Sequence, residues 1–359
     1  MTLPRLLWDW GTAYDLFVSL GVLHEPAEFG VRGAWAAGVR ARLPAAERET
    51  LAQSHSLGCV PLHWIYTLPE PKDGAAVLWT LGQIPPAERL PVLALAPGVF
   101  SADVAEMLMS VAARGTWDEK ERDILRTAHP WDEEKPLFSP EELTTVLNWW
   151  AHPEEFGERY LAALRVYQEV FFGEEERRIR PALQGALSRA QELAGRLALP
   201  DLLEELSQGL RFDKLPAMAE LVLAPSYWTT PLVTFGQVSA ERAIWLFGAR
   251  PPDVSLVPGE AVPDAILRVL NALSDPTRLR ILHYLVQGPL SPAELSRRLR
   301  LRAPTVTHHL QALRLAGLVQ LTLGEGKEVK RYAARLEAIA AAFASLKDFL
   351  EKSEVESTD

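Results

Sequence analysis

Residues 274–319 read SDPTRLRILHYLVQGPLSPAELSRRLRLRAPTVTHHLQALRLAGLV, and this run decides the fold of the C-terminal part of the chain. Asp275-Pro276 predicts a capped helix that ends near Val286. Ser291-Pro292-Ala293-Glu294 is a capping box that begins a second helix, and after a tight turn Pro304 begins a third. A helix, a short turn and a further helix form the unit that places its last helix in the major groove of DNA. The run therefore predicts a helix-turn-helix.

The third helix of this run has two faces at helical spacing. Val306, Leu310 and Leu313 form an apolar face that we expect in the core. The other side carries hydroxyl, imidazole, amide and guanidinium groups, which can hydrogen-bond to base edges. These outward residues are Thr305, Thr307, His308, Gln311 and Arg314.

A β-hairpin is expected directly after this helix. Gly317 ends the helix as a left-handed cap, residues 318–323 alternate as a strand, and residues 329–333 return. Three cations give this wing a charge that suits phosphates or the minor groove: Lys327, Lys330 and Arg331.

Further cations lie beside the turn, at Arg297, Arg298, Arg300 and Arg302. They form either a solvated face or phosphate contacts, and their position favours phosphate contacts. His308 and His309 are adjacent, so they diverge around the helix and rarely share one metal ion. One of them is expected to contact DNA and the other to pack, and both stay candidate DNA-binding residues.

The segment from about Ile266 to Phe349 resembles the ArsR-type (arsenic-repressor-like) family of bacterial winged-helix regulators. The matching pieces are ALSDPTRLRIL at 272–282, PTVTHHLQAL at 304–313 and AGLV at 316–319. The resemblance covers under a quarter of the chain. It implies a winged helix-turn-helix that binds operator DNA, usually as a repressor, and a long N-terminal extension domain precedes it here.

Two departures from the family pattern bear on function. Members often carry a polar cap before the proline of the recognition helix, where this chain has Arg302 and Ala303. The missing cap costs about 1 kcal/mol of helix stability, while Arg302 gains the chance of a phosphate contact. Metal-sensing relatives use cysteines in the helix that matches residues 293–299, or Asp and His in the last helix. Those ligands are absent from both places, so no metal or other cofactor is expected.

The resemblance also implies a homodimer built from the first and last helices of this domain. The last helix carries apolar residues at intervals of 3, 4, 3 and 4, which form one stripe. A two-fold dimer reads two half-sites about one helical turn apart. The expected dimerisation residues are Ile266, Leu270, Leu336, Ile339, Phe343, Leu346 and Leu350.

The charged residues also distinguish the C-terminal region from the rest of the chain. The net charge is −10, yet residues 263–336 carry 12 Lys and Arg against 5 Asp and Glu, whereas residues 1–262 carry 23 against 36. All 11 tryptophans lie between Trp8 and Trp245. A basic module on an acidic body is what phosphate binding by one domain requires.

We therefore expect a mainly α protein in three parts. Residues 1–250 form an acidic, tryptophan-rich, mostly helical domain that ends in a small β-sheet. Residues 251–262, rich in proline and glycine, form a linker. Residues 263–352 form the winged helix-turn-helix with its C-terminal dimerisation helix.

The role of residues 1–250 stays open between three alternatives. They form an effector-sensing or dimerising module, an enzyme whose substrate or product controls DNA binding, or a protein-docking platform. Common catalytic motifs such as Gly-x-Ser-x-Gly, phosphate loops and His-Glu-x-x-His are missing, so we expect a regulator and no enzyme. A non-metal small molecule is the expected effector.

The chain reads as a cytoplasmic protein. Its N-terminus lacks the layout of a signal peptide, and its apolar runs are too short to span a membrane. Cys59 is the only cysteine, which excludes an intramolecular disulfide. The expected partners are operator DNA and a second copy of the chain.

Overall fold

The computed structural model describes residues 3–55, 57, 60–128, 138–212, 218–255, 262–324 and 330–351. The chain folds into two compact units, and each unit is built from two separate segments of the sequence. Unit 1 comprises Met1–Leu187 and Met218–Ala249, and unit 2 comprises Ser188–Ala217 and Arg250–Asp359. Unit 1 ends at Ala249. Residues 188–217, which we expected in the N-terminal domain, instead belong with the C-terminal unit.

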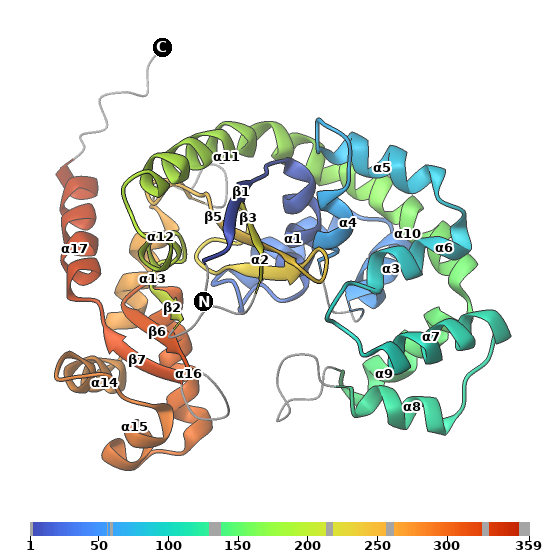
Figure 1. Ribbon diagram of the computed structural model, residues 1–359. Helices are drawn as coiled ribbons and strands as arrows, with labels where there is room; N and C mark the ends of the chain where they lie inside the picture. The colour runs from blue at the N-terminus through green and yellow to red at the C-terminus, as the bar shows by residue number, and fades with distance from the viewer. Residues whose placement is uncertain are drawn as a thin grey trace. The chain divides into compact units, whose positions relative to one another are not determined.

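Unit 1 contains a four-stranded sheet in the order β1-β3-β5-β4. Its strands are β1 (Arg5–Trp8), β3 (Glu220–Ser226), β5 (Arg242–Gly248) and β4 (Thr234–Gln237). β1, β3 and β5 run parallel, and β4 is antiparallel to β5. β3 is buried from Leu221 to Ser226, as expected of a strand that is covered on both faces. Figure 1 shows β1, in blue, beside the yellow β3.

The sheet differs from the expected one in its first strand. The three strands near residues 220–248 lie close to the runs expected for a small sheet that ends the domain. β1 was not anticipated, because four residues are too few to show a strand period. It pairs in parallel with β3, with Trp8 beside Leu223, and therefore ties the start of the chain to the end of unit 1.

Helices make up most of the rest of unit 1. They are α1 (Thr12–His24), α2 (Gly33–Ala41), α3 (Ala45–His55), α4 (Leu62–Tyr66), α5 (Gly74–Gln83), α6 (Pro86–Ala94), α7 (Ala102–Arg114), α8 (Glu119–Arg126), α9 (Pro140–Ala151), α10 (Pro153–Tyr167) and the first part of α11 (Gly173–Ala194). A π-helical turn, Gln168–Phe172, joins α10 to α11. A capping box begins α9, since Ser139 Oγ accepts from the Glu142 amide and the Glu142 carboxylate accepts from the Ser139 amide.

A buried carboxylate connects α1 to the end of β3. Asp15 is fully buried, and it accepts hydrogen bonds from Ser226 Oγ at 2.7 Å, the Tyr227 amide at 3.1 Å and the Trp228 amide at 2.9 Å. Burial raises the pKa of Asp15 to about 7, although these three donors oppose the rise. The carboxylate fixes the loop after β3 against α1.

Unit 2 contains a three-stranded sheet and helices on its flanks. The helices are α12 (Leu199–Leu206), α13 (Asp264–Leu273), α14 (Pro276–Val286), α15 (Pro292–Leu299), α16 (Ala303–Leu315) and α17 (Leu336–Glu351). The strands are β2 (Leu210–Phe212), β6 (Val319–Leu323) and β7 (Lys330–Ala334), in the order β2-β6-β7. β6 and β7 form the antiparallel hairpin predicted for the wing.

The core of unit 2 joins the helix-turn-helix to this hairpin. Ile281 and Leu285 of α14, Leu295 of α15, Leu310 of α16 and Val319 of β6 belong to one buried cluster. Asp275 caps α14 by accepting from the Thr277 and Arg278 amides, as the sequence predicts. The helices of the sequence-predicted winged helix are therefore all present in one packed domain.

β2 is an addition to this domain that the sequence analysis missed. It pairs in parallel with β6, with Leu210 beside Leu321, and the Leu321 amide donates to the Gly209 carbonyl oxygen at 2.8 Å. α12 leads into it, and Glu204 of that helix accepts a hydrogen bond from Gln320 at 2.9 Å. The strand covers an edge of β6 that would otherwise have unpaired backbone groups.

Candidate nucleic-acid interface

The turn between α15 and α16 is set by backbone geometry. Ser291 and Glu294 form the expected capping box at the start of α15. Arg300 ends that helix in the left-handed conformation with φ 57°, and its amide donates to the Ser296 carbonyl oxygen. The Leu301 amide donates to the same oxygen at 3.1 Å. The chain then enters α16 at Ala303, where Arg302 holds the N-cap position with no side-chain cap hydrogen bond.

The inner face of α16 is apolar and fully covered. Val306, Leu310 and Leu313 are 0% exposed and belong to the core of unit 2. These contacts fix the rotation of α16 about its axis, so the opposite side is held outward. That is the orientation a recognition helix requires.

Four of the five residues predicted on the outer side of α16 are exposed, and the fifth, Arg314, is buried. The exposed residues of this face are Arg302, Thr305, Thr307, His308 and Gln311. They cluster in the first two turns, where residues of such a helix reach base edges. Hydroxyl, imidazole and amide groups are suited to that role.

Exposed cations lie on two other elements of the same unit, α15 and β7. Arg297, Arg298 and Arg300 are exposed at the C-terminal end of α15. Lys330 and Arg331 are exposed on β7. Lys327, the third predicted wing cation, lies outside the described residues. The described cations therefore belong to the same unit as the polar face of α16.

The two adjacent histidines have different environments. His308 is exposed, whereas the His309 side chain is only 13% exposed and its Nδ1 lies 3.9 Å from an Asp275 carboxylate oxygen. The Arg278 and Thr277 amides and the nearby His309 ring hold the pKa of Asp275 below its usual range. His308 is the one of the pair that faces solvent.

Arg314 was predicted on the outer side of α16, but the structure places its side chain inside unit 2. Its side chain is buried, and it donates from Nη2 to the Ser207 carbonyl oxygen at 2.7 Å and from Nη1 to the Gln208 carbonyl oxygen at 3.2 Å. Burial, and then the neighbouring Arg335, lower the pKa of Arg314 to about 10. Because this guanidinium is covered and hydrogen-bonded inside unit 2, it is not available to DNA.

Arg335 is a second structural arginine, and the sequence analysis did not single it out. It donates from Nη1 to the Gln208 carbonyl oxygen at 2.9 Å and to the Gly317 carbonyl oxygen at 3.1 Å. Gln208 has a positive φ of 56°, which directs its carbonyl into this pair of arginines. The spacing of Arg314 from Leu310 by one helical turn is the signal that places it on the inner face. Arg335 has no comparable signal, because its partners lie far away in the sequence.

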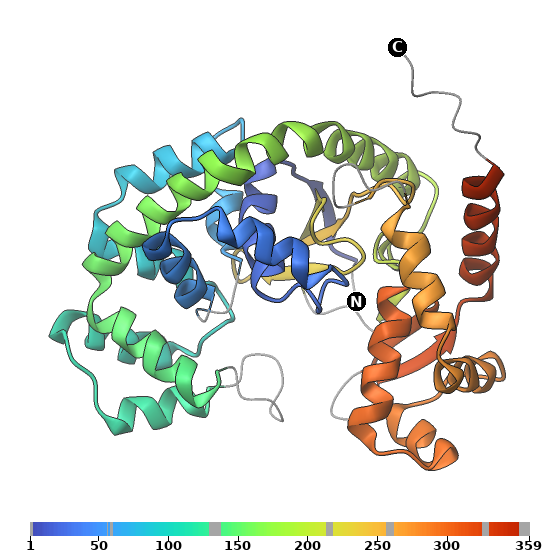
Figure 2. The same cartoon turned by 180° about the vertical axis from the view of Figure 1, so that it is seen from behind.

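The predicted dimerisation residues divide into covered and exposed ones. Ile266 is buried within unit 2, and Ile339 packs against the core. Leu270 is 40% exposed on α13, and no residue of α17 is buried. Leu336, Phe343 and Leu350 of α17 are 55%, 53% and 72% exposed, with Leu346 partly covered. In Figures 1 and 2, α17 is the dark red helix at the outer side of its unit.

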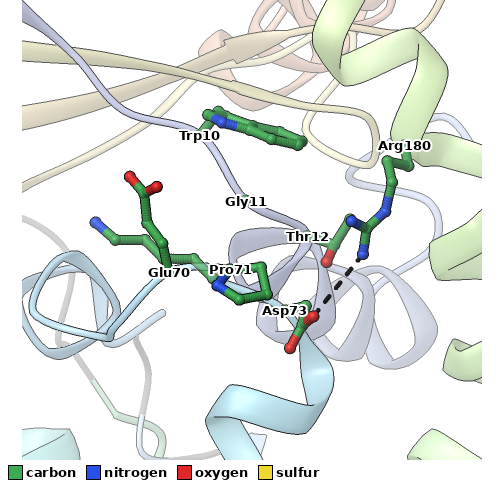
Figure 3. A pocket seen from close by; sticks show the side chains of 8 residues that line it. Trp10, Gly11, Thr12, Glu70, Pro71, Asp73 and Arg180 are labelled. Carbon is green, nitrogen blue, oxygen red and sulfur yellow. Dashed lines mark ion pairs between the residues drawn. The ribbon is translucent and has the colours of Figure 1, made fainter.

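Unit 1 has a surface pocket where β1 leads into α1 (Figure 3). Trp10, Glu70 and Arg180 line it, and Arg180 faces Asp73 across 3.9 Å. Lys72, which also lines it, is buried and donates to Asp9 at 2.5 Å and to the Tyr66 carbonyl oxygen at 2.7 Å. Lys72, Asp73 and Arg180 of this pocket are thus each engaged in an ion pair.

Within the ranges that the structure describes, no group of three His, Cys, Asp or Glu residues is placed to hold a metal ion. The described helices include none with the length and apolar character that crossing a membrane requires.

Known proteins resemble the chain in its C-terminal region. A family model described as a helix-turn-helix domain matches residues 273–322. Proteins from Mycobacterium tuberculosis and Mycobacterium bovis, each named HTH-type transcriptional regulator CmtR, are 43% identical to the chain over 82 residues. That stretch is 23% of this chain and 68% of each relative. With a packed helix-turn-helix, an exposed polar helix face and this identity, the chain belongs to the HTH-type transcriptional regulators.

Proposed function

We propose that the protein is a sequence-specific, ArsR-like repressor whose α16 reads the major groove of an operator. The observation that carries this proposal is the two-faced α16, with an inner face at 0% exposure and an outer face of exposed polar groups. The cations at the end of α15 and on β7 contact the phosphates on either side. Base specificity comes from Thr305, Thr307, His308 and Gln311.

The functional form in this proposal is a homodimer. The apolar stripe of α17 supports it, because Leu336, Phe343 and Leu350 are each more than half exposed on one helix. Leu270 on α13 adds a further exposed apolar side chain. A second copy of the same stripe covers these groups in a two-fold interface. Such a dimer presents two copies of α16 to two half-sites.

Unit 1 is the sensing part of this cytoplasmic regulator, and it binds a non-metal small molecule rather than catalysing a reaction. Two cavities in unit 1 support a ligand-binding role. Coupling requires that the ligand and DNA favour different states of the protein.

Fluorescence anisotropy tests DNA binding. The full chain is titrated into its own promoter-proximal duplex and into a scrambled duplex of equal length, across a salt series. We expect a preference of about a hundredfold or more for the native duplex, and affinity that falls steeply with salt. Failure to bind either duplex at low salt contradicts the proposal. Equal affinity for both at every salt concentration contradicts its sequence-specific part.

A further inference from the structure

Unit 1 encloses a second cavity of about 350 Å³, bounded by α1, α3, α4, α10 and β4. It is distinct from the pocket of Figure 3, with which it shares no lining residue. Cavities of about 300–1,000 Å³ are typical of small-molecule sites, so this one suits a small ligand.

The walls of this cavity combine aliphatic side chains with four aromatic ones. Phe17, Phe29, Tyr160 and Phe235 contribute side chains from four different segments. Phe17 is anchored by an edge contact to Trp64 at 6.2 Å between ring centroids. Phe235 is 55% exposed, which is unusual for a phenylalanine.

The wall formed by β4 depends on a glycine. A Cβ atom at Gly236 would lie 3.2 Å from Leu62 Cδ1, tighter than an ordinary contact. The absence of a side chain lets β4 lie close to α4, and this brings Phe235 and the α4 residue His63 to the same cavity.

The ionisable groups of the lining are one carboxylate, Glu25, and two histidines, His55 and His63. Among the described residues that line the cavity, Glu25 supplies a carboxylate and none is a lysine or arginine. Burial lowers the pKa of His63, whose Nε2 donates to the Val92 carbonyl oxygen at 2.9 Å, and therefore disfavours the charged form of this ring. The Glu25 side chain is 58% exposed and lies 3.4 Å from His55 Nε2. That contact positions the carboxylate at the cavity without burying it.

We infer that this cavity binds a small aromatic organic cation, with its flat apolar body between the aromatic rings and its positive charge toward Glu25. The faces of aromatic rings attract cations, and a delocalised cation loses little hydration when it enters an apolar site. The acidic character of residues 1–262, with 23 basic against 36 acidic residues, adds a favourable long-range field. The ligand's role as an effector rests on the proposed function, whereas its binding does not.

Three probes of nearly equal size separate charge from shape: 1-methylquinolinium, its neutral isostere 1-methylnaphthalene, and the anion 1-naphthoate. Binding to the full-length protein is measured by equilibrium dialysis at pH 8, where histidine rings are neutral. We expect 1-methylquinolinium to bind about tenfold more tightly than 1-methylnaphthalene, and 1-naphthoate to bind most weakly. Equal or reversed affinities of the cation and its neutral isostere would overturn the inference.

Variants locate the site. Glu25→Gln removes the charge but keeps the shape, so we expect about a tenfold loss of affinity for the cation and no change for the neutral probe. Phe235→Ala weakens both probes, and it leaves the fold intact because the ring is already more than half exposed. Glu28→Gln is the matched control, since it changes net charge equally but does not line the cavity. An equal effect of Glu28→Gln and Glu25→Gln means that diffuse charge, not this site, selects the cation, and the inference fails.

Anisotropy with saturating 1-methylquinolinium then separates the two proposals. A changed affinity for the native duplex, lost in Glu25→Gln, supports both. Cation binding at this cavity with unchanged DNA affinity leaves the site in place and contradicts the sensing role. Sequence-specific DNA binding by a protein that does not bind the cation overturns the site alone.

Discussion

Arg314 Nη2 donates to the Ser207 carbonyl oxygen at 2.7 Å, although 107 positions of the chain separate the two residues. The guanidinium lies on the inner side of the recognition helix and holds the α12–β2 segment against it. With Arg335 it satisfies the carbonyl of Gln208, a residue in a left-handed conformation. The recognition helix is thus connected through its inner side to a segment from the middle of the chain.

Replacing Arg314 tests this connection. Arg314→Met keeps the aliphatic stem but leaves the carbonyl oxygens of Ser207 and Gln208 with fewer donors. We expect the free energy of unfolding of unit 2 to fall by about 2–4 kcal/mol. Urea unfolding with hydrogen-exchange readout of α12 and β2 measures it. Arg297→Met, at an exposed position of the same unit, serves as the control and should change stability by less than about 0.5 kcal/mol. Similar decreases in the free energy of unfolding in both variants would show that the buried hydrogen bonds of Arg314 do not stabilise unit 2.

Arg302 is expected to affect stability and DNA affinity in opposite directions. Arg302→Ser supplies the side-chain cap that α16 lacks, so stability should rise by about 1 kcal/mol. The same change removes a phosphate contact, which should weaken binding to all duplexes and reduce the slope of log K against log salt by about 1. Arg302→Ala should show the loss of affinity without the gain in stability. The paired measurements are thermal unfolding and salt-dependent anisotropy, and an unchanged salt slope in both variants argues against a phosphate contact.

His308 is expected to act on sequence preference. Its ring is exposed on the outer face of α16 and carries hydrogen-bonding nitrogens, so His308→Ala should cost about 1–3 kcal/mol of binding to the native duplex. The salt slope should stay the same, because no phosphate contact is lost. A panel of duplexes with single base-pair changes reads the preference. A uniform loss over the whole panel would mean that His308 contacts the backbone and not a base.

The exposed stripe of α17 predicts an oligomer that can be broken without unfolding the protein. Phe343→Glu combined with Leu350→Glu places charges at positions that are 53% and 72% exposed, so the subunit should stay folded. Sedimentation at micromolar concentration should show a monomer where the unmodified chain shows a dimer. Affinity for a two-half-site duplex should fall about a hundredfold or more. Lys347→Glu, exposed on the same helix but outside the stripe, should remain a dimer. A monomeric unmodified chain would remove the basis of this prediction.

Asp15 predicts how the stability of unit 1 depends on pH. Burial raises its pKa to about 7, against about 4 in an unfolded chain, so the folded state holds the proton more tightly. The stability contributed by the protonated group is complete below about pH 4 and is lost as pH rises toward 7. Asp15→Asn cannot ionise and should flatten this part of the profile, whereas Asp103→Asn, at an exposed position, should not. Tryptophan fluorescence during urea unfolding reports on unit 1 alone, because all 11 tryptophans belong to it. The same slope in Asp15→Asn as in the unmodified chain would assign the effect to another group.

Local signals in the sequence were enough to predict the helix-turn-helix. Capping boxes, prolines at first helical positions and the inward Val306, Leu310 and Leu313 are all set by residues a few positions apart. The missing side-chain cap at the start of α16 was predictable for the same reason, because it depends only on the residue at position 302. Elements whose partners are distant could not be found in this way. β1 and β2 are short, and each is stabilised by pairing with a strand more than a hundred positions away.

In the candidate site, too, the features set by nearby residues were predictable and those set by distant residues were not. Residues on the outer face of α16 were predictable from helical spacing, because the apolar positions mark the opposite side. Arg314 was misassigned because an arginine next to a DNA-contacting face is usually exposed. Its burial depends on carbonyl oxygens at Ser207 and Gln208, and nothing near Arg314 in the sequence indicates them. The cavity at Glu25 was likewise invisible, since its walls come from helices and a strand far apart in the chain.

The pairing of β2 with β6 has a consequence for how the protein is made. On the ribosome, Leu210 emerges long before Leu321, its neighbour in the sheet. Between them the nascent chain must return to unit 1 for β3 to β5 and then leave it again at Arg250. The first unit to be completed is therefore the acidic one, while α12 and β2 wait as an unfinished part of the other. The unit that contains the helix-turn-helix can therefore be completed only after all segments of unit 1 have been synthesised.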